Sequence, residues 1–203
     1  MNSLAISLEK GQRIDLTKGK AGLSKILVGL GWDPVASGSG GFFGKLFGGG
    51  APNIDCDASV LMLENGRVTE NKNVIYFGNL KSRCGSIEHT GDNLTGEGSG
   101  DDEQIIVDLQ KVPSHIHKLV FVVNIYDCVK RSQHFGMIEN AFIRIVNMND
   151  RVEMVKYNLR DDYSGRTSLI AGEIYRDGAE WKFTAVGEGT NDTSITEIVK
   201  RYA

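Results

Sequence analysis

The segment HTGDNLTGEGSGDDE, residues 89–103, is the stretch around which we expect the rest of this chain to be organised. It separates five acidic side chains by glycines and small polar residues, and an apolar strand-like sequence, QIIVDL, follows it at residues 104–109. The four glycines allow the backbone to fold back on itself, so that carboxylate, amide and carbonyl oxygens can converge. The composition therefore indicates a site built from oxygen atoms.

Charge is concentrated in the same region. The window from Cys84 to Gln110 contains seven acidic residues and no Lys or Arg. Subtracting these seven from the 26 acidic residues leaves 19 against 23 basic ones, so the net charge of −3 divides into −7 in this window and +4 elsewhere. Two carboxylates about 4 Å apart repel by roughly 4 kcal/mol at an effective dielectric constant of about 20. Either water around an open loop or a bound hard cation has to relieve this repulsion.

Calcium is the cation that best fits such a loop, because it takes about 6–8 oxygen ligands from carboxylates, amides and backbone carbonyls. A solvated acidic loop without a cation is the alternative that the residues leave open. If calcium binds, the segment offers these candidate ligands: Asp92, Asn93, Glu97, Asp101, Asp102 and Glu103.

The segment does not match an EF-hand. Asp92 and Glu103 have the spacing of the first and twelfth positions, but the third and fifth positions are Leu94 and Gly96, and Glu97 stands where Gly is required. Residues from elsewhere must complete any site. Asp55 and Asp57, at the entrance to the apolar sequence VLML, are the candidates, because alternate residues of a strand point to the same side.

Length and composition indicate one soluble domain. The chain has 203 residues, which is enough for a sizeable core, and it has no apolar run near 18 residues. Its start lacks the basic and apolar regions of a signal peptide. Its three cysteines form no CxxC pair, which favours a reducing cytoplasm. The acidic balance argues against a nucleic-acid partner.

Alternating apolar residues predict an all-β protein, a β-sandwich with a short C-terminal helix. Hairpin turns are predicted at Lys10-Gly11, Asn65-Gly66 and Asp177-Gly178, and Pro34 is expected to end a strand. Ser194 and Glu197 form a capping box at the start of the helical tail. The predicted strands are residues 4–8, 12–16, 24–30, 60–63, 73–77, 104–109, 118–125, 137–147, 152–159, 167–175 and 180–186.

An internal echo predicts that the sandwich is built from two related halves. The pattern at residues 15–30 recurs at 108–123, an offset of 93, and the DASV of 57–60 is echoed by the NAFI of 140–143. A Gly/Phe-rich insert, residues 36–51, interrupts the first half. Its glycines predict flexibility. Its aromatic residues either pack on their own domain or form a docking element for a partner or a membrane surface.

Four motifs resemble the signatures of the TerD family, the tellurium-resistance and chemical-damage-resistance proteins that include bacterial general stress proteins. They are VGLGWDP at 28–34, DCDAS at 55–59, HTGDNLTGEGSGDDEQ at 89–104 and FGMIENAFIRIV at 135–146. The resemblance implies a cytoplasmic, calcium-binding β-sandwich that acts in tolerance of tellurite and other stresses. The family's acidic signature maps onto Asp55, Asp57, Asp92, Asn93, Asp101, Asp102 and Glu103.

The sequence contains no nucleophile elbow, no HExxH and no dinucleotide fingerprint after a strand. We therefore expect a calcium-dependent binding or scaffold module without chemistry of its own. The expected partners are calcium ions and other tellurium-resistance or stress proteins, membrane-associated ones among them. The alternative is a metal-assisted hydrolase or a thiol-based tellurite-detoxifying protein, for which Cys56 is the candidate thiol.

Overall fold

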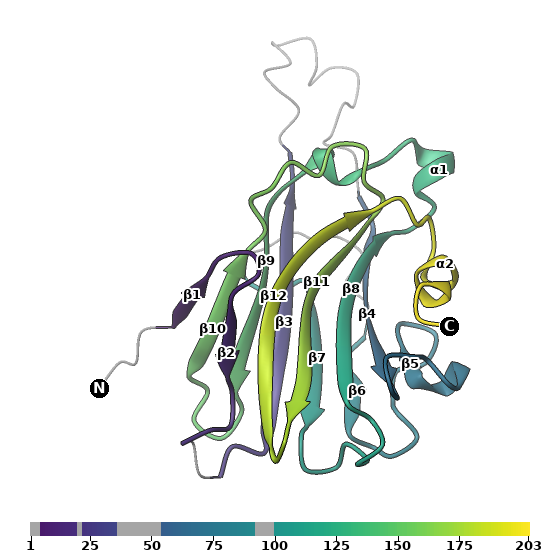
Figure 1. The fold of residues 1–203 in the computed structure, drawn as a ribbon. Coiled ribbons are helices and arrows are strands. Elements are labelled where there is room, and N and C mark those ends of the chain that lie inside the picture. The colour runs from purple at the N-terminus through teal and green to yellow at the C-terminus, as the bar shows by residue number, and fades with distance from the viewer. Residues whose placement is uncertain (1–4, 20–21, 36–53, 92–99) are drawn as a thin grey trace.

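Two six-stranded sheets pack face to face in the computed structural model, which describes residues 5–19, 22–35, 54–91 and 100–203 (Figure 1). The insert at 36–51 lies outside the described residues, as do three predicted ligands, Asp92, Asn93 and Glu97. The predicted all-β sandwich with a short C-terminal helix is confirmed.

The strand order places the two ends of the chain on different sheets. The first sheet contains, in spatial order, β1 (Ile6–Leu8), β10 (Glu153–Asn158), β9 (Ile138–Asn147), β3 (Lys25–Pro34), β7 (Glu103–Asp108) and β6 (Ile87–His89). The second contains β2 (Arg13–Asp15), β12 (Glu180–Thr190), β11 (Ser168–Asp177), β8 (Lys118–Ile125), β4 (Cys56–Leu63) and β5 (Val74–Ile75). All neighbouring strands are antiparallel except β1 and β10, which are parallel.

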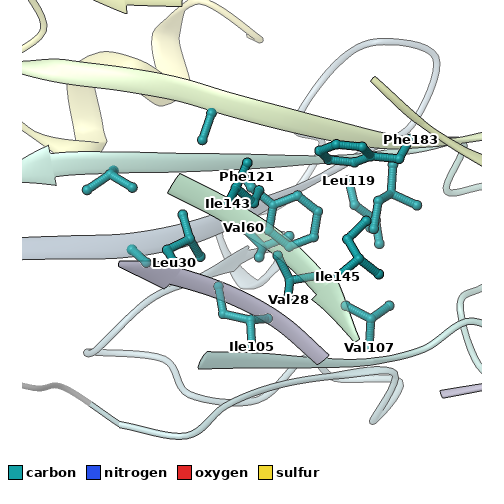
Figure 2. Close-up of a cluster of buried hydrophobic side chains, with 14 of the residues drawn as sticks. Val28, Leu30, Val60, Ile105, Val107, Leu119, Phe121, Ile143, Ile145 and Phe183 are labelled. Carbon is teal, nitrogen blue, oxygen red and sulfur yellow. The ribbon is translucent and has the colours of Figure 1, made fainter. Parts of the chain in front are cut away.

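The main core lies between the sheets. Every second residue of β7 is buried, as the alternating sequence predicts, and this inward row meets apolar residues of the second sheet. Strand β8 is buried along almost its whole length, because the sandwich covers one face and the C-terminal segment covers the other. Figure 2 shows the labelled core residues Val28, Leu30, Val60, Ile105, Val107, Leu119, Phe121, Ile143, Ile145 and Phe183.

The echo between the two halves has a counterpart in the topology. Strand β3 of the first half lies in the first sheet, and its counterpart β8 lies in the second. The next strand of each half crosses to the opposite sheet, so that β4 pairs with β8 and β9 pairs with β3. Each half therefore completes both sheets, and neither half has a core of its own.

Two local predictions were wrong. Lys10-Gly11 does not close a hairpin, because β1 pairs with β10 in one sheet and β2 pairs with β12 in the other. Strand β3 extends past its predicted end at residue 30, and it ends at Pro34, as expected, where Pro34 pairs with Ile138 of β9. Strand β7 pairs with β3 only as far as Leu30, so in the described part of the chain Pro34 lies on an edge, where its missing N–H breaks no ladder bond.

The short helices lie at the ends and outside of the sandwich. Helix α1 (Cys128–Arg131) follows β8, and the 3-10 turns η2 (Asn71–Asn73) and η3 (Phe135–Met137) precede β5 and β9. Helix α2 (Ile195–Lys200) begins at its predicted cap: the Glu197 N–H donates to Ser194 Oγ at 3.3 Å, while the Glu197 carboxylate accepts the Thr193 N–H at 2.7 Å. Its apolar side covers the outer face of the second sheet, where Ile198 is fully buried.

Replacing Ile198 with Ala should lower the free energy of unfolding by about 2–4 kcal/mol, because it leaves a cavity between α2 and the sheet. The matched change Thr196→Ala, on the exposed side of the same helix, should stay within about 0.5 kcal/mol of the parent. Urea denaturation measures both. Equal effects would show that α2 does not contribute to the core.

Candidate cation-binding site

Acidic residues from both sheets gather around the thiol of Cys56. Asp102 and Glu103 lead into β7, while Asp55 and Asp57 flank the thiol at the start of β4. Burial raises the pKa of Cys56 well above its ordinary value, and the charges of these four carboxylates raise it further. The structure thus brings both predicted groups of acids within electrostatic reach of one side chain, although about 45 residues of sequence separate them.

Asp101 has a different role from its neighbours, because protein donors occupy both of its carboxylate oxygens. Arg144 of β9 donates from Nε to Oδ1 at 2.6 Å and from Nη2 to Oδ2 at 2.9 Å, and the Gln104 amide donates to Oδ2 at 3.1 Å. The side chain of Asp101 is completely buried. Arg144 also donates to Glu153 at 2.9 Å, and its pKa is raised by these bonds, that to Asp101 most of all.

The repulsion that the sequence predicted is thus partly relieved from within the chain. No base stands near Asp101 in the sequence, but Arg144 lies 43 residues further along and reaches it on the outer face of the first sheet. Arg144 is therefore a structural ion-pair partner of both Asp101 and Glu153. The prediction that water or a cation must relieve the repulsion was incomplete, because it took account only of residues close to the acids in sequence.

Two glycines of β3 make room for this arrangement. A Cβ on Gly29 would lie 2.2 Å from Oδ1 of Asp101, and a Cβ on Gly31 would lie 2.5 Å from the Phe142 ring and 2.8 Å from the Gly100 carbonyl oxygen. The acidic segment therefore lies directly on the strand backbone. The alternating glycines of VGLGW are the sequence signal for this contact; the motif had indicated the family resemblance but not the contact.

Asp102 extends the pairing between β7 and β3. Its N–H donates to the Leu30 carbonyl at 2.8 Å, and its Oδ2 accepts the Trp32 N–H at 2.7 Å. Burial raises the pKa of Asp102; the bond from Trp32 opposes the rise, and the charges of Asp33 and Asp101 add to it. Asp102 is therefore a carboxylate on which a nearby cation would have a strong stabilising effect.

Glu103 points into the sandwich, where it meets a histidine that the sequence analysis overlooked. His89 Nε2 lies 2.8 Å from Glu103 Oε2 and 3.1 Å from the Ala58 carbonyl oxygen, and both side chains are 1% exposed. The Gly91 N–H donates to His89 Nδ1 at 3.1 Å, so Nδ1 acts as the acceptor and Nε2 carries the proton. His89 thereby connects β6 to the backbone of the opposite sheet.

The two acids at the start of β4, Asp55 just before the strand and Asp57 within it, face different surroundings. Asp55 lies 3.6 Å from Nη1 of Arg131 in α1. Asp57 is 6% exposed and lies on the outward side of β4, since its neighbours Cys56 and Ala58 belong to the core. Within residues 5–19, 22–35, 54–91 and 100–203, no three His, Cys, Asp or Glu side chains are arranged to hold a metal ion. The oxygen-rich donor set suits a hard cation, but the described part does not form a complete site.

Comparisons with known proteins agree on one family. The model of the TerD domain matches residues 4–202. The chain is 75% identical over 199 residues to stress response protein SCP2 of Bacillus subtilis (strain 168), covering 98% of this chain and 100% of that protein. It is 42% identical over 187 residues to tellurium resistance protein TerD of Serratia marcescens, covering 92% and 91%.

A solved structure shows the same fold. A homologue of the telluride resistance protein TerD from Streptomyces coelicolor A3(2) matches with a TM-score of 0.67 at 19% identity, over 90% of this chain and 99% of that one.

Replacing Gly29 with Ala should lower the free energy of unfolding by roughly 1–3 kcal/mol, because the new methyl group would displace the Asp101 carboxylate from Arg144. In an Asp101→Ala background the same change should cost clearly less, since the methyl group then finds room. A double-mutant cycle measured by urea denaturation gives the coupling. Additive effects would mean that Asp101 does not lie over Gly29.

Proposed function

The chain belongs to the TerD family of stress-response and tellurium-resistance proteins, and from this premise we propose that it is a calcium-binding module that acts in tolerance of tellurite and other chemical stress. The observation that carries the proposal is that Asp55, Asp57, Asp102 and Glu103 all lie close enough to the Cys56 thiol for their charges to raise its pKa. Carboxylate oxygens in such number suit a divalent cation with oxygen ligands.

We propose that the predicted ligands have two different roles, anchoring and calcium binding. Asp101 acts as the anchor of the acidic segment, because Arg144 and Gln104 already occupy its oxygens. The residues proposed to hold calcium are Asp55, Asp57, Asp102 and Glu103, with Asp92, Asn93 and Glu97 from residues outside the described part. Calcium would neutralise these acids and fix the segment that joins β6 to β7.

We propose a binding or scaffold role rather than catalysis. The thiol-based alternative depends on Cys56, which is 1% exposed and has a strongly raised pKa, so the thiolate that such chemistry needs is disfavoured. No other observation favours a hydrolase. The proposed partners are other tellurium-resistance or stress proteins, membrane-associated ones among them.

We further propose that the protein acts in the cytoplasm. Its three cysteines, Cys56, Cys84 and Cys128, are all free thiols, which suits a reducing compartment. No helix in the described part of the chain is long and apolar enough to cross a membrane.

Calcium should raise the melting temperature of chelator-treated protein, and the gain in stability should follow mass action, about 2.7 kcal/mol at a hundredfold excess over the dissociation constant. Thermal scans with added calcium, magnesium or zinc measure the effect and its selectivity. An identical scan with and without each of the metals would refute the proposed cation site.

Asp102→Asn and Asp101→Asn should separate binding from anchoring. Asp102→Asn should leave the metal-free protein at neutral pH as stable as the parent or more so, because it removes a repelled, partly buried charge, and it should reduce the calcium-induced gain. Asp101→Asn should lower metal-free stability by about 1–3 kcal/mol through the weakened bonds from Arg144, yet keep the calcium gain.

The pH dependence gives a second readout for Asp102. A pKa raised in the folded state means that the folded chain binds the proton more tightly, so this carboxyl lowers stability as the pH rises from its unfolded pKa, near 4, through its higher folded value. On acidification, the difference in unfolding free energy between the metal-free parent and the more stable Asp102→Asn variant should therefore disappear. A difference that is constant with pH would contradict the assignment.

A further inference from the structure

A pocket of about 270 Å³ lies on the outer face of the second sheet, away from the anchor at Asp101. Strands β4 and β8 form its floor, and the turn after β5, the turn after β8 and the start of α2 form its walls. Its floor residues point outward because the residues beside them in sequence, Ala58 and Val123, belong to the main core. The family comparisons assign nothing to this pocket.

Polar atoms on the floor lack hydrogen bonds. Ser59 is 1% exposed and Asn124 is 6% exposed, and Ser59 Oγ and Asn124 Oδ1 have no hydrogen-bond partner in the described part of the chain. Leaving such a group buried and unsatisfied costs roughly 1–3 kcal/mol. Further along the same face, Leu61 and Val122 are apolar and pack beneath α2. Polar residues are thus found where the face is hollow and apolar residues where it is covered, which indicates a ligand that donates hydrogen bonds.

Aromatic rings form one wall. Tyr76 and Phe77 meet edge to face, with ring centroids 5.2 Å apart. Their turn is held by reciprocal backbone bonds between Tyr76 and Asn79, and Gly78 is required there because a Cβ would lie 2.7 Å from the Tyr76 ring. Phe77 and Tyr126 are each nearly half exposed although they line the pocket. The backbone bonds therefore fix the turn that carries Tyr76 and Phe77, while the rings of Phe77 and Tyr126 remain open to solvent.

The charges of the pocket are negative. Asp57 and Asp127 line it, and no Lys or Arg does so within the described residues. Lys130 lies 3.5 Å from Asp127, while Asp57 lies on the floor of the pocket and is 6% exposed. A neighbouring guanidinium, that of Arg131, already lies 5.4 Å from the centroid of the Tyr126 ring, which shows that this ring accepts a cation.

We propose that this pocket binds the ammonium or guanidinium group of a small organic cation. The N–H groups of the ligand donate to Asp57, Ser59 Oγ and Asn124 Oδ1, and its positive charge lies against the rings of Phe77 and Tyr126. The volume is at the lower limit for a ligand pocket. The ligand is therefore a small amine or guanidine, or the charged terminal group of a longer amine or guanidine. The proposal shares Asp57 with the proposed calcium ligands, but it rests on the pocket and needs no bound metal.

The test titrates the full chain with n-butylammonium chloride by calorimetry in the presence of a chelator. Saturable binding is expected, whereas n-butanol, which has the same shape without the charge, should not bind. Equal binding of the two compounds, or no saturable binding of the amine, would overturn the proposal.

Variants locate the binding. Phe77→Ala should weaken butylammonium binding by about two- to thirtyfold through the lost cation–π contact. The control Leu80→Ala changes a similarly exposed apolar residue outside the pocket and should leave binding unchanged. Equal effects of the two changes would mean that the cation does not lie against the aromatic wall.

Asn124→Leu distinguishes a binding residue from a structural one. It should weaken binding at least about tenfold, since it removes an acceptor for a charged donor, yet it should not lower the melting temperature, because the acceptor it removes has no partner in the described chain. A lower melting temperature with unchanged binding would show that Asn124 is structural and overturn the assignment.

A calcium arm separates this proposal from the proposed function. Repeating the titration with saturating calcium should weaken butylammonium binding several-fold, because calcium and the ammonium group would share the Asp57 carboxylate. A chain that shows a calcium-induced melting shift but binds no butylammonium in the presence of chelator would overturn this inference while supporting calcium binding. A chain that binds butylammonium but shows no calcium-induced melting shift would support this inference and refute the calcium proposal.

Discussion

The ion pair between Asp101 and Arg144 is the interaction on which the arrangement of the acidic segment depends. It is bidentate and buried on the Asp101 side, and it holds the segment against the bare backbone of Gly29. With Asp101 fixed, the register of β7 on β3 places Asp102 at the N–H of Trp32 and turns Glu103 inward. The ion pair thus determines which acids face the candidate cation site. The Asp101 carboxylate instead holds the acidic segment in place.

Because different partners compensate different carboxylates, the acids can be concentrated in one stretch of sequence without disrupting the fold. Arg144 compensates the buried carboxylate of Asp101 on the outer face of the first sheet, and Glu103 meets His89 in the sandwich interior. Asp102 keeps a charge that burial and its neighbours make unfavourable, as the rise in its pKa indicates. Strand β4 presents the Cys56 thiol to the core and Asp57 to the outer face, so one strand joins the acidic end of the sandwich to the polar pocket beside the start of α2.

Much of the fold was predictable because its periodicity is local. The alternation in β7 and the capping box of α2 were recognised correctly. The three-residue strand β6 and the single-turn helix α1 were missed, because neither is long enough to show a period. The site was harder, since its geometry depends on long-range contacts. The acids at residues 55–57 and 101–103 were identified, but Arg144 was not seen as the partner of Asp101, because only the pairing of β9 with β3 brings it there.

Native-state hydrogen exchange at Asp102 tests the central claim most directly, because its N–H donates to the Leu30 carbonyl at the end of β7. If protein contacts hold the acidic segment, this amide is slow to exchange in chelator-treated protein, and calcium slows it only slightly further. Exchange at the rate of an unstructured chain without calcium, followed by strong protection on its addition, would contradict the account, since the metal and not Arg144 would then be the anchor.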